Sequence, residues 1–368
     1  TIQNSPSSFN FGSNADAKSL IKRSPLDART PSIMGGPNAV PVSPELYIPA
    51  HRSYIKQNRV DSIAPASVEY SSKYRTKGTP LTIYMAQEGV VNLKEACRLE
   101  GRPDISVVTP PYIEDNYSAI SITHPMFMKP GDLQEIISQG FKVSFDELTR
   151  AAHYKTLGVN SLCTQMTVMG GITAASPEQF AIELVAQGLK ALYAYSSSAY
   201  FKYPTHMEYA PSASLETLWS SFVASMALSR NTRQFHGTVV HNSAGPCTKM
   251  MMYETAIQAI GYTVCGDDML SGPVASGGRI PDYTGGLDAL FMAEVAELAK
   301  KLSLNDADFV CREIYEKYKY KIDKPDIGFS FSQCYDLDTI EPSEEYYKVY
   351  DSVIDDIYDI LSSGPLRY

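Results

Sequence analysis

Several patterns that define large protein classes are missing from this chain of 368 residues. No stretch approaches the roughly 18 to 20 consecutive apolar residues that a membrane-spanning helix needs. No long basic run is present, and the formal net charge is -9. An acidic surface disfavours binding to phosphate backbones and anionic membranes. We therefore expect no membrane span and no nucleic-acid partner.

The six cysteines do not form any Cys-x-x-Cys pair, and their spacings are wide. This pattern argues against a zinc ribbon and against a disulfide scaffold. Because no His-x-His pattern supports another metal centre, no metal ligands are predicted. The start at Thr1 shows neither the basic nor the apolar segment of a secretory signal peptide. Reduced thiols in a cytoplasmic protein are the expected state.

The usual motifs of nucleotide-binding folds and serine hydrolases are also missing. The first predicted strand ends in Gly35-Gly36-Pro37 rather than Gly-x-Gly-x-x-Gly, and no Gly-Lys-Ser/Thr motif occurs. No Gly-x-Ser-x-Gly elbow is found. A doubly wound nucleotide-binding domain and a Ser-His-Asp hydrolase are therefore disfavoured.

What the chain does contain is an alternation of short apolar runs with amphipathic segments. Residues 1–30 are rich in Ser, Asn and Asp, and we expect an irregular N-terminal arm there. For residues 31–368 the alternation predicts a single (β/α)8 barrel of the TIM type with additional C-terminal helices. The eight strands are predicted at 33–34, 62–65, 105–108, 148–154, 165–169, 194–200, 237–240 and 263–265. Helices are predicted from 43 onward and at 82–99, 176–188, 215–228, 247–260, 287–302, 306–320 and 344–361.

Active sites of such barrels lie just after the strands, so polar residues at the predicted strand ends are candidates. His153 and Tyr154 lie at the end of the fourth predicted strand, where the histidine is either an acid–base group or a hydrogen-bonded structural residue. His241 follows the seventh strand and is a candidate base or metal ligand. Asp268 follows the eighth, as a carboxylate at the barrel mouth or an acid at a helix N-terminus.

Longer motifs give a resemblance to a known family. A turn at Gly101-Arg102-Pro103 leads into a buried run that ends near Val108, and further stretches match in order along most of the chain. These stretches include Ala152-His153-Tyr154-Lys155, Ala244-Gly245-Pro246-Cys247-Thr248, Thr284-Gly285-Gly286, Gln333-Cys334-Tyr335-Asp336 and Pro342-Ser343-Glu344-Glu345-Tyr346. The chain resembles the corrinoid-dependent monomethylamine methyltransferases of methanogens. The family's chains extend well upstream of Thr1, so the resemblance implies an N-terminal portion that this sequence does not contain.

The resemblance implies a (β/α)8 barrel and a homo-oligomer, typically a hexamer. The family's chain binds no cofactor itself, and a separate partner protein presents the corrinoid. By position, the pyrrolysine that forms the family's amine adduct corresponds to Val108. The other active-site positions are also substituted: two carboxylates become Gln134 and Thr164, an amide becomes Val239, and a tyrosine becomes His241. Glu135 is adjacent to Gln134, so a shift of one residue would return a carboxylate to that position.

Valine has no electrophilic carbon, so the amine adduct of the family cannot form at Val108. Two functions remain in close balance. The first is methyl transfer from a methylated amine or related compound to a corrinoid protein without an adduct, for which a quaternary ammonium is already a suitable donor. The second is a catalytically inactive homologue that acts as a structural or regulatory subunit. A third, less favoured hypothesis is unrelated barrel chemistry that uses His153, His241 and Asp268. An open pocket at the barrel mouth would favour catalysis, whereas a plug formed by Tyr200, Phe201 or Met207 would favour the inactive form.

Overall fold

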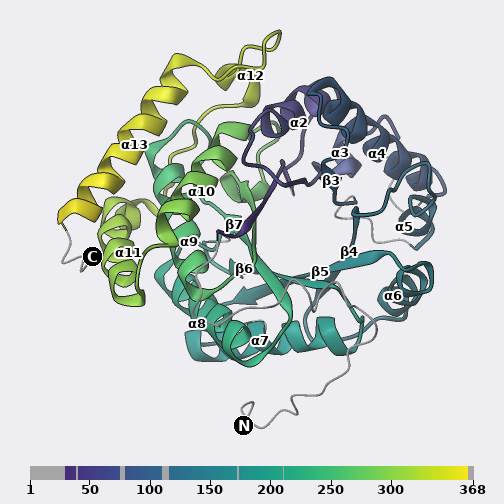
Figure 1. Ribbon diagram of the computed structural model, residues 1–368, viewed down its shortest axis with the longest axis horizontal. Coiled ribbons are helices and arrows are strands. Elements are labelled where there is room, and N and C mark those ends of the chain that lie inside the picture. Colours follow the sequence, from purple (N-terminus) through teal and green to yellow (C-terminus); the bar gives the residue numbers. More distant parts are fainter. Residues whose placement is uncertain are drawn as a thin grey trace.

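The computed structural model describes residues 30–38, 40–74, 79–109, 116–171, 174–209 and 211–363, so nearly all of the predicted N-terminal arm lies outside the described residues. Eight parallel strands form one sheet that curves into a barrel, and helices surround it, as predicted (Figure 1). The strands are β1 (Ser32–Gly35), β2 (Ser62–Ile63), β3 (Ser106–Val107), β4 (Leu133–Gln139), β5 (Asn160–Met169), β6 (Ala199–His206), β7 (Phe235–His241) and β8 (Met269–Val274).

The strand order shows how the barrel closes. Hydrogen-bonded neighbours run β3-β2-β1-β8-β7-β6-β5-β4, which leaves β3 and β4 at the two edges. A parallel bridge between Val108 and Leu133 joins these edges, and the Thr109 amide donates to the Leu133 carbonyl at 2.8 Å. Closure removes the exposed strand edges that would otherwise invite pairing with another chain.

Side chains alternate between the barrel interior and the helical layer, as the pleat of a strand requires. On β6, Phe201 faces inward and packs with Leu162 and Met269, whereas Tyr200 faces outward and donates a hydrogen bond to the Leu184 carbonyl. The interior is therefore filled by side chains, and the larger core lies between the sheet and its helices.

The principal helices follow the strands and cover the outside of the sheet. Helix α7 shows how local sequence starts them: Ser176 accepts a hydrogen bond from the Gln179 amide, and Pro177 occupies the first helical position. The helices of the barrel and its flank are α2 (Tyr47–Ile55), α3 (Val68–Ser71), α4 (Thr82–Leu99), α5 (Asn116–Ser121), α6 (Phe145–Leu157), α7 (Pro177–Tyr193), α8 (Leu215–Asn231), α9 (Lys249–Cys265), α10 (Gly286–Ala299), α11 (Leu304–Tyr318), α12 (Phe331–Cys334) and α13 (Glu344–Ser363). Three short 3-10 helices join them, η2 (Pro44–Leu46), η3 (Ser276–Gly278) and η4 (Lys319–Lys321).

The helix α4 lies where it was predicted, but two predicted strands are wrong and a third is displaced. Residues 148–154 belong to α6, which begins with a capping box between Ser144 and Glu147. Residues 263–265 are the last turn of α9, which ends at Gly266 in the left-handed conformation. The strand predicted at 194–200 begins only at Ala199. The segments 148–154 and 263–265 were too short to show a period and were assigned to the wrong element, whereas the strand at 194–200 was placed five residues too early.

The true fourth strand, β4, was missed. Its sequence alternates along Leu133–Gln139, and the alternate positions Gln134, Ile136 and Ser138 are buried. The polar members of this strand hid its pattern, because a strand with glutamine, glutamate and serine does not read as an apolar run.

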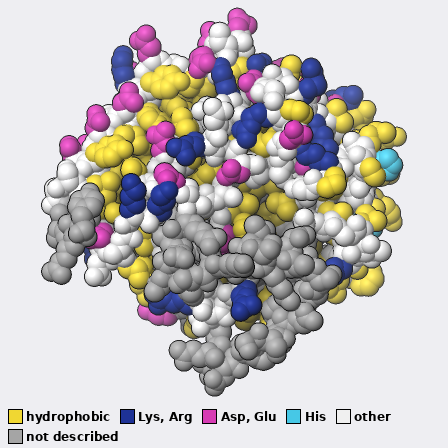
Figure 2. Space-filling model, in the orientation of Figure 1, with side chains coloured by type: hydrophobic (Ala, Val, Ile, Leu, Met, Phe, Trp, Pro, Cys, Tyr) yellow, Lys and Arg dark blue, Asp and Glu magenta, His cyan; other side chains and the backbone are white. Residues whose placement is uncertain are grey.

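The additional C-terminal helices are present and lie on one side of the barrel (Figure 1). Helices α11 and α13 pack against α9, and the segment between them returns to the barrel, where the Gly245 amide donates to the Asp326 carbonyl at 2.9 Å. In the described part of the chain, no helix has the length and apolar character needed to cross a bilayer. On the visible face, acidic, basic and apolar side chains are interspersed (Figure 2).

Candidate active site

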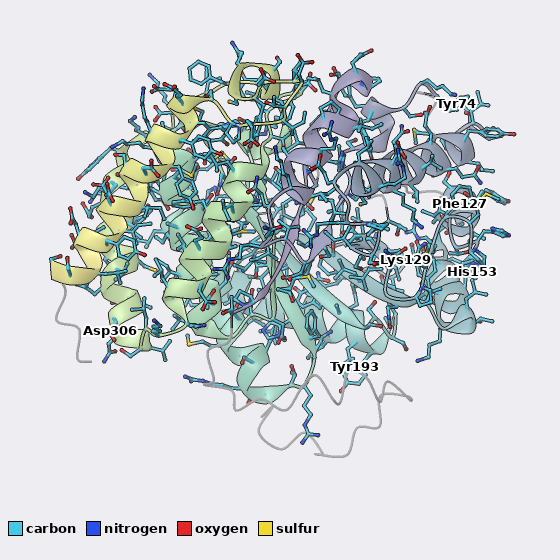
Figure 3. All side chains as sticks on the ribbon, turned by 45° about the horizontal axis from the view of Figure 1, so that its top comes forward. Tyr74, Phe127, Lys129, His153, Tyr193 and Asp306 are labelled. Carbon is cyan, nitrogen blue, oxygen red and sulfur yellow. The ribbon has the colours of Figure 1, made fainter. Side chains whose placement is uncertain are left out.

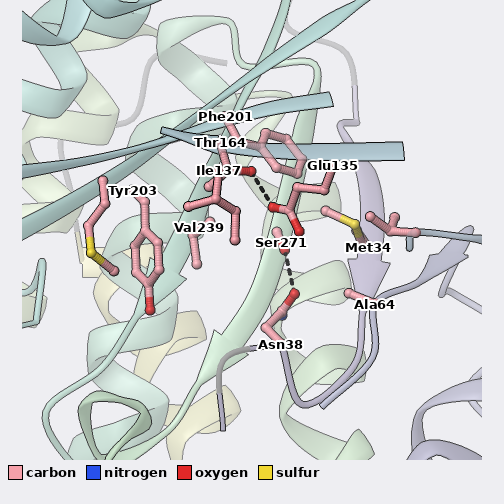
Figure 4. Close-up of a pocket in the computed structure, with 12 residues that line it drawn as sticks. Met34, Asn38, Ala64, Glu135, Ile137, Thr164, Phe201, Tyr203, Val239 and Ser271 are labelled. Atoms are coloured by element: carbon pink, nitrogen blue, oxygen red, sulfur yellow. Dashed lines mark hydrogen bonds between the residues drawn. The ribbon is translucent and has the colours of Figure 1, made fainter. Parts of the chain in front are cut away.

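A small pocket lies inside the barrel, toward the ends of the strands. Below it, Leu162, Ala199 and Met269 pack together and form an apolar floor. The cavity volume is about 30 Å³, which is room for about two water molecules. All eight strands or the residues that directly follow them contribute to its wall (Figure 4). The lining residues are Met34, Asn38, Ala64, Val108, Glu135, Ile137, Thr164, Met166, Phe201, Tyr203, Val239 and Ser271.

Glu135 on β4 provides the pocket's carboxylate. The Thr164 hydroxyl donates a hydrogen bond to Glu135 Oε1 at 2.5 Å, and the Glu135 amide donates to the Thr109 hydroxyl at 3.2 Å. Within the described ranges, no lysine, arginine or histidine forms an ion pair with this carboxylate. The pocket therefore contains a half-buried acid whose negative charge has no basic partner among the described residues.

Burial dominates the acidity of Glu135. It raises the pKa of this carboxyl from 4.5 to about 7, and the hydrogen bond from Thr164 opposes the rise only in part. Near neutral pH the group therefore exists as a mixture of acid and carboxylate, and a cation in the pocket would favour the ionised form.

The walls around Glu135 are apolar and electron-rich. The rings of Phe201 and Tyr203 line one side, and the thioethers of Met34 and Met166 contribute to others. Aromatic faces attract cations, most strongly where water is excluded. The combination of one carboxylate with aromatic rings is suited to a small organic cation.

Of the residues matched to the family's active site, three line this pocket. Val108 directly follows β3, whereas Thr164 and Val239 belong to β5 and β7, and all three line the pocket inside the barrel. His241 lies above them at the end of β7, with its ring 5.0 Å from the Tyr203 ring in an edge-to-face arrangement. Burial lowers the pKa of His241 to about 4, so the imidazole is neutral at physiological pH.

Gln134 does not reach the pocket. Its side chain faces the outer layer, where it accepts a hydrogen bond from the Thr109 hydroxyl at 2.8 Å and donates one to the Met128 sulfur. Neighbouring residues of a strand point to opposite sides, so the pocket position belongs to Glu135. The assignment of Gln134 to the pocket was wrong by one residue, and the adjacent acid was the only signal that could have revealed this.

His153 and Tyr154 are also not at the barrel mouth. Both lie on α6, and His153 is at the periphery of the molecule, where its ring nitrogen pairs with the Thr123 hydroxyl at 3.0 Å (Figure 3). Tyr154 is buried against the outside of the sheet. Their predicted position was wrong because the segment is a helix rather than a strand.

Asp268 precedes β8 instead of following a strand, and so lies at the end of the barrel opposite the pocket. Its carboxylate accepts a hydrogen bond from the His236 amide at 3.1 Å, and its backbone carbonyl accepts one from the Ser32 amide at 2.9 Å. These contacts connect β8 with β7 and β1, which is a structural role. The prediction of a catalytic carboxylate at this position was wrong.

Among the described residues, no group of three or more His, Cys, Asp or Glu side chains is placed to hold a metal ion.

Comparison with known proteins identifies the family and agrees with the barrel fold. The model of the family "Monomethylamine methyltransferase MtmB" matches residues 1–361. Monomethylamine methyltransferase MtmB of Methanosarcina mazei is 29% identical over 361 residues, which covers 98% of this chain and 79% of that protein. Monomethylamine methyltransferase MtmB1 of Methanosarcina acetivorans is 28% identical over 361 residues, which again covers 98% of this chain and 79% of that protein.

Solved structures give the same result. The crystal structure of the Methanosarcina barkeri monomethylamine methyltransferase matches with a TM-score of 0.88 and 28% identity, covering 94% of this chain and 75% of that one. The crystal structure of the hydroxylamine MtmB complex matches with the same values. On its barrel fold and its match to the family model over residues 1–361, this chain belongs to the monomethylamine methyltransferase MtmB family.

Proposed function

We propose that this chain transfers a methyl group from a methylated ammonium compound to a corrinoid carried by a partner protein, without a pyrrolysine adduct. The observation that supports it most directly is the uncompensated carboxylate of Glu135 in a closed-in apolar pocket. Membership in the MtmB family supplies the reaction class.

The charge of the pocket favours a cationic substrate. A buried carboxylate without a partner is costly, and an ammonium group would remove that cost by pairing with it. The rings of Phe201 and Tyr203 would add attraction to the cation. The volume of about 30 Å³ admits only a small group, such as the methylated head of the substrate.

Val108 offers no electrophilic atom that could form an adduct with the substrate. The reaction is therefore limited to methyl donors whose nitrogen is already a good leaving group. In a quaternary or protonated ammonium, the nitrogen leaves as a neutral amine when the C–N bond breaks, and the electron pair of that bond stays on nitrogen. Glu135 would hold the positive charge in the ground state and orient the methyl group toward the mouth. Thr164 would hold the carboxylate in place through its hydrogen bond.

The corrinoid would have to remain outside the pocket, because the cavity is far smaller than a corrinoid ring. A corrinoid presented at the barrel mouth would supply the nucleophile that accepts the methyl group. His241 and Tyr203 lie at the boundary between pocket and mouth, where they would exclude water from the transfer.

The alternative is a catalytically inactive subunit, and the small size of the cavity is what favours it. However, the three side chains that were predicted to block the barrel mouth in an inactive form do not block it. Tyr200 faces the helices, Phe201 forms a side of the pocket, and Met207 is 59% exposed. The pocket remains open to a small donor, which supports a catalytic role.

The test is methyl transfer to reduced free cobalamin from a panel of donors: mono-, di-, tri- and tetramethylammonium, and dimethyl sulfide. Activity is expected with at least one ammonium donor, and Glu135→Gln should lower kcat/KM by at least roughly tenfold because it removes the charge partner. Glu313→Gln on the exposed face of α11 is the control. No transfer from any donor, together with a foreign subunit in the native complex, would establish the inactive role instead.

We also propose a homo-oligomer, with the hexamer as the expected form, that works with a corrinoid protein in the cytoplasm. Exposed apolar side chains at Phe141, Val143 and Phe145 support a subunit contact, because large apolar groups gathered in one segment often mark interfaces. Native mass spectrometry of the purified protein tests the assembly, and a monomer at micromolar concentration would contradict it.

A further inference from the structure

Two of the sequence stretches that resemble the family each contain a cysteine, and the proposed reaction uses neither of them. Cys247 lies in the loop after β7, directly before Thr248, which caps the N-terminus of α9. Cys334 is the last residue of the short helix α12, in the C-terminal segment that returns to the barrel. These two parts of the chain are far apart in the sequence but lie against each other in the fold.

Backbone groups beside the two cysteines hold these segments together. The Phe329 amide donates a hydrogen bond to the Pro246 carbonyl at 3.1 Å. A side chain at Gly328 would collide with the same carbonyl, because its Cβ would lie 2.3 Å from the Pro246 oxygen. The Cys334 sulfur donates to the Phe329 carbonyl at 3.7 Å. Cys334 is therefore bound to the residue that pairs with the direct neighbour of Cys247.

The two thiols are also hydrogen-bond partners of each other. A thiol has one proton, so Cys334 donates either to the Phe329 carbonyl or, when Cys247 is ionised, to the Cys247 sulfur. This bond lowers the pKa of Cys247, although burial and the charges of Asp288 and Glu345 oppose it. The same bond and burial raise the pKa of Cys334. The pair thus consists of one thiol that ionises readily and one that keeps its proton.

The backbone and the surroundings of Cys247 also mark it as the reactive member of the pair. Its φ is 61°, in the left-handed region that residues with a side chain seldom occupy, and residues strained in this way cluster at functional sites. The N-terminus of α9 follows directly, and the N-terminus of a helix favours a thiolate. Cys247 is 7% exposed and Cys334 is 1% exposed, so a small reagent reaches Cys247 more easily.

The other four cysteines have the opposite character. Burial raises the pKa of Cys97 to about 11 and the pKa values of Cys163 and Cys265 to about 12. Burial also raises the pKa of Cys311. Since the thiolate is the form that reacts, these four thiols remain protonated and unreactive near neutral pH. Cys247 is therefore distinguished from them by its acidity, and by a second thiol in contact with it.

We propose that Cys247 and Cys334 form a redox-sensitive dithiol, which a peroxide converts to an intramolecular disulfide. The Cys247 thiolate attacks one peroxide oxygen, the O–O bond breaks, and the released hydroxide takes up a proton to give water and a sulfenic acid on Cys247. The Cys334 sulfur then attacks the Cys247 sulfur, the S–O bond breaks, and the hydroxide leaves with the Cys334 proton as a second water. The two thiols are oxidised by two electrons and the peroxide is reduced by two. The product ties the loop after β7 to the C-terminal segment, and a small dithiol would reverse it.

The test treats the purified full chain with a small excess of hydrogen peroxide, unfolds it, blocks the remaining thiols with N-ethylmaleimide and counts them by intact mass. Two of the six thiols should be lost while the mass remains that of a single chain. Digestion without reduction should yield a peptide that links Cys247 to Cys334, and dithiothreitol should restore both thiols. Cys97→Ala removes a thiol that is also buried, so it is the matched control and should still lose two thiols.

Single variants distinguish the roles of the two thiols. Cys334→Ala leaves Cys247 without a resolving partner, so peroxide should leave a sulfenic acid on Cys247 that dimedone labels. Cys247→Ala should give neither a disulfide nor a label on Cys334. Six free thiols in the unmodified chain after treatment, or a link between any other two cysteines, would overturn the proposal, and this measurement depends on no variant. Equal dimedone labelling of Cys334 in Cys247→Ala would overturn the assignment of Cys247 as the reacting thiol.

Discussion

Two acids on opposite faces of the same sheet, the fully buried Asp267 and the half-buried Glu135, differ in what surrounds them. Outside the barrel, beneath the helices, Asp267 receives a hydrogen bond from the Lys202 ammonium at 2.9 Å and another from the Thr238 hydroxyl at 2.5 Å. His236 Nε2 lies 3.4 Å from the same carboxylate. Inside the barrel, Glu135 has one hydrogen bond from Thr164 and no basic partner among the described residues.

The difference indicates that the two acids have different purposes. The charge of Asp267 is neutralised within the protein, so this acid contributes to the contact between β6, β7 and the α9–β8 loop. On the proposed function, a substrate cation would compensate the charge of Glu135.

The largest expected change in stability comes from breaking the ion pair between Lys202 and Asp267. Lys202→Met keeps the chain length but leaves Asp267 buried without its cation, which should lower the free energy of unfolding by about 3–5 kcal/mol. Urea denaturation measures this. The double variant Lys202→Met/Asp267→Asn removes both charges and should recover most of the loss. A single variant as stable as the unmodified chain would show that the pair is not held as described.

Removing the charge of Glu135 should raise the free energy of unfolding above pH 7, whereas Lys202→Met lowers it. Because the pKa of Glu135 is raised from 4.5 to about 7 in the folded state, folding takes up a proton between these values. Stability from this group is therefore full below about pH 4.5 and is lost as the pH rises to about 7, by about 3 kcal/mol. Glu135→Gln should be more stable than the unmodified chain above pH 7, and the gain should shrink toward pH 5.

Urea midpoints between pH 5 and 8 check this difference. The pH dependence should decrease but not vanish in Glu135→Gln, because burial also raises the pKa of Glu254 and of Asp288 to about 7. Glu313→Gln, which is exposed, should follow the unmodified chain throughout. A loss of stability in Glu135→Gln at pH 8 would indicate that this carboxylate has a compensating partner after all.

Supplying the missing cation should stabilise the chain. Methylammonium chloride, whose two heavy atoms suit the small cavity, should add about 1.4 kcal/mol to the free energy of unfolding at ten times its Kd, by mass action. Sodium chloride at equal ionic strength is the control for screening. Thermal unfolding at pH 8 should show the gain for the unmodified chain and none for Glu135→Gln; an equal gain in both would place the cation elsewhere.

The smallest effect is expected from Thr164. Thr164→Val keeps the shape of the side chain but removes the hydrogen bond to Glu135, which should destabilise the chain by about 1 kcal/mol at pH 8. At pH 5 the carboxyl is neutral and needs the bond less, so the difference should diminish. Denaturation at the two pH values measures it, and an equal loss at both would point to packing rather than charge.

Much of the fold could be predicted from local patterns. The helix at 82–99 was located correctly because 18 residues show the helical period clearly. The errors fall where patterns are short or polar. The capping box at Ser144 and Glu147 and the left-handed Gly266 are signals that could have corrected α6 and α9.

The sequence by itself determined the barrel class and the family. That Val108 occupies the position of the family's reactive residue is a prediction from the resemblance. Only the tertiary structure decided which side chains meet. Since strand neighbours point to opposite faces, a shift of one residue exchanges Gln134 for Glu135, and no local pattern separates the two. The register is set by closure, when Val108 pairs with Leu133 and so turns Glu135 toward Thr164 inside the barrel.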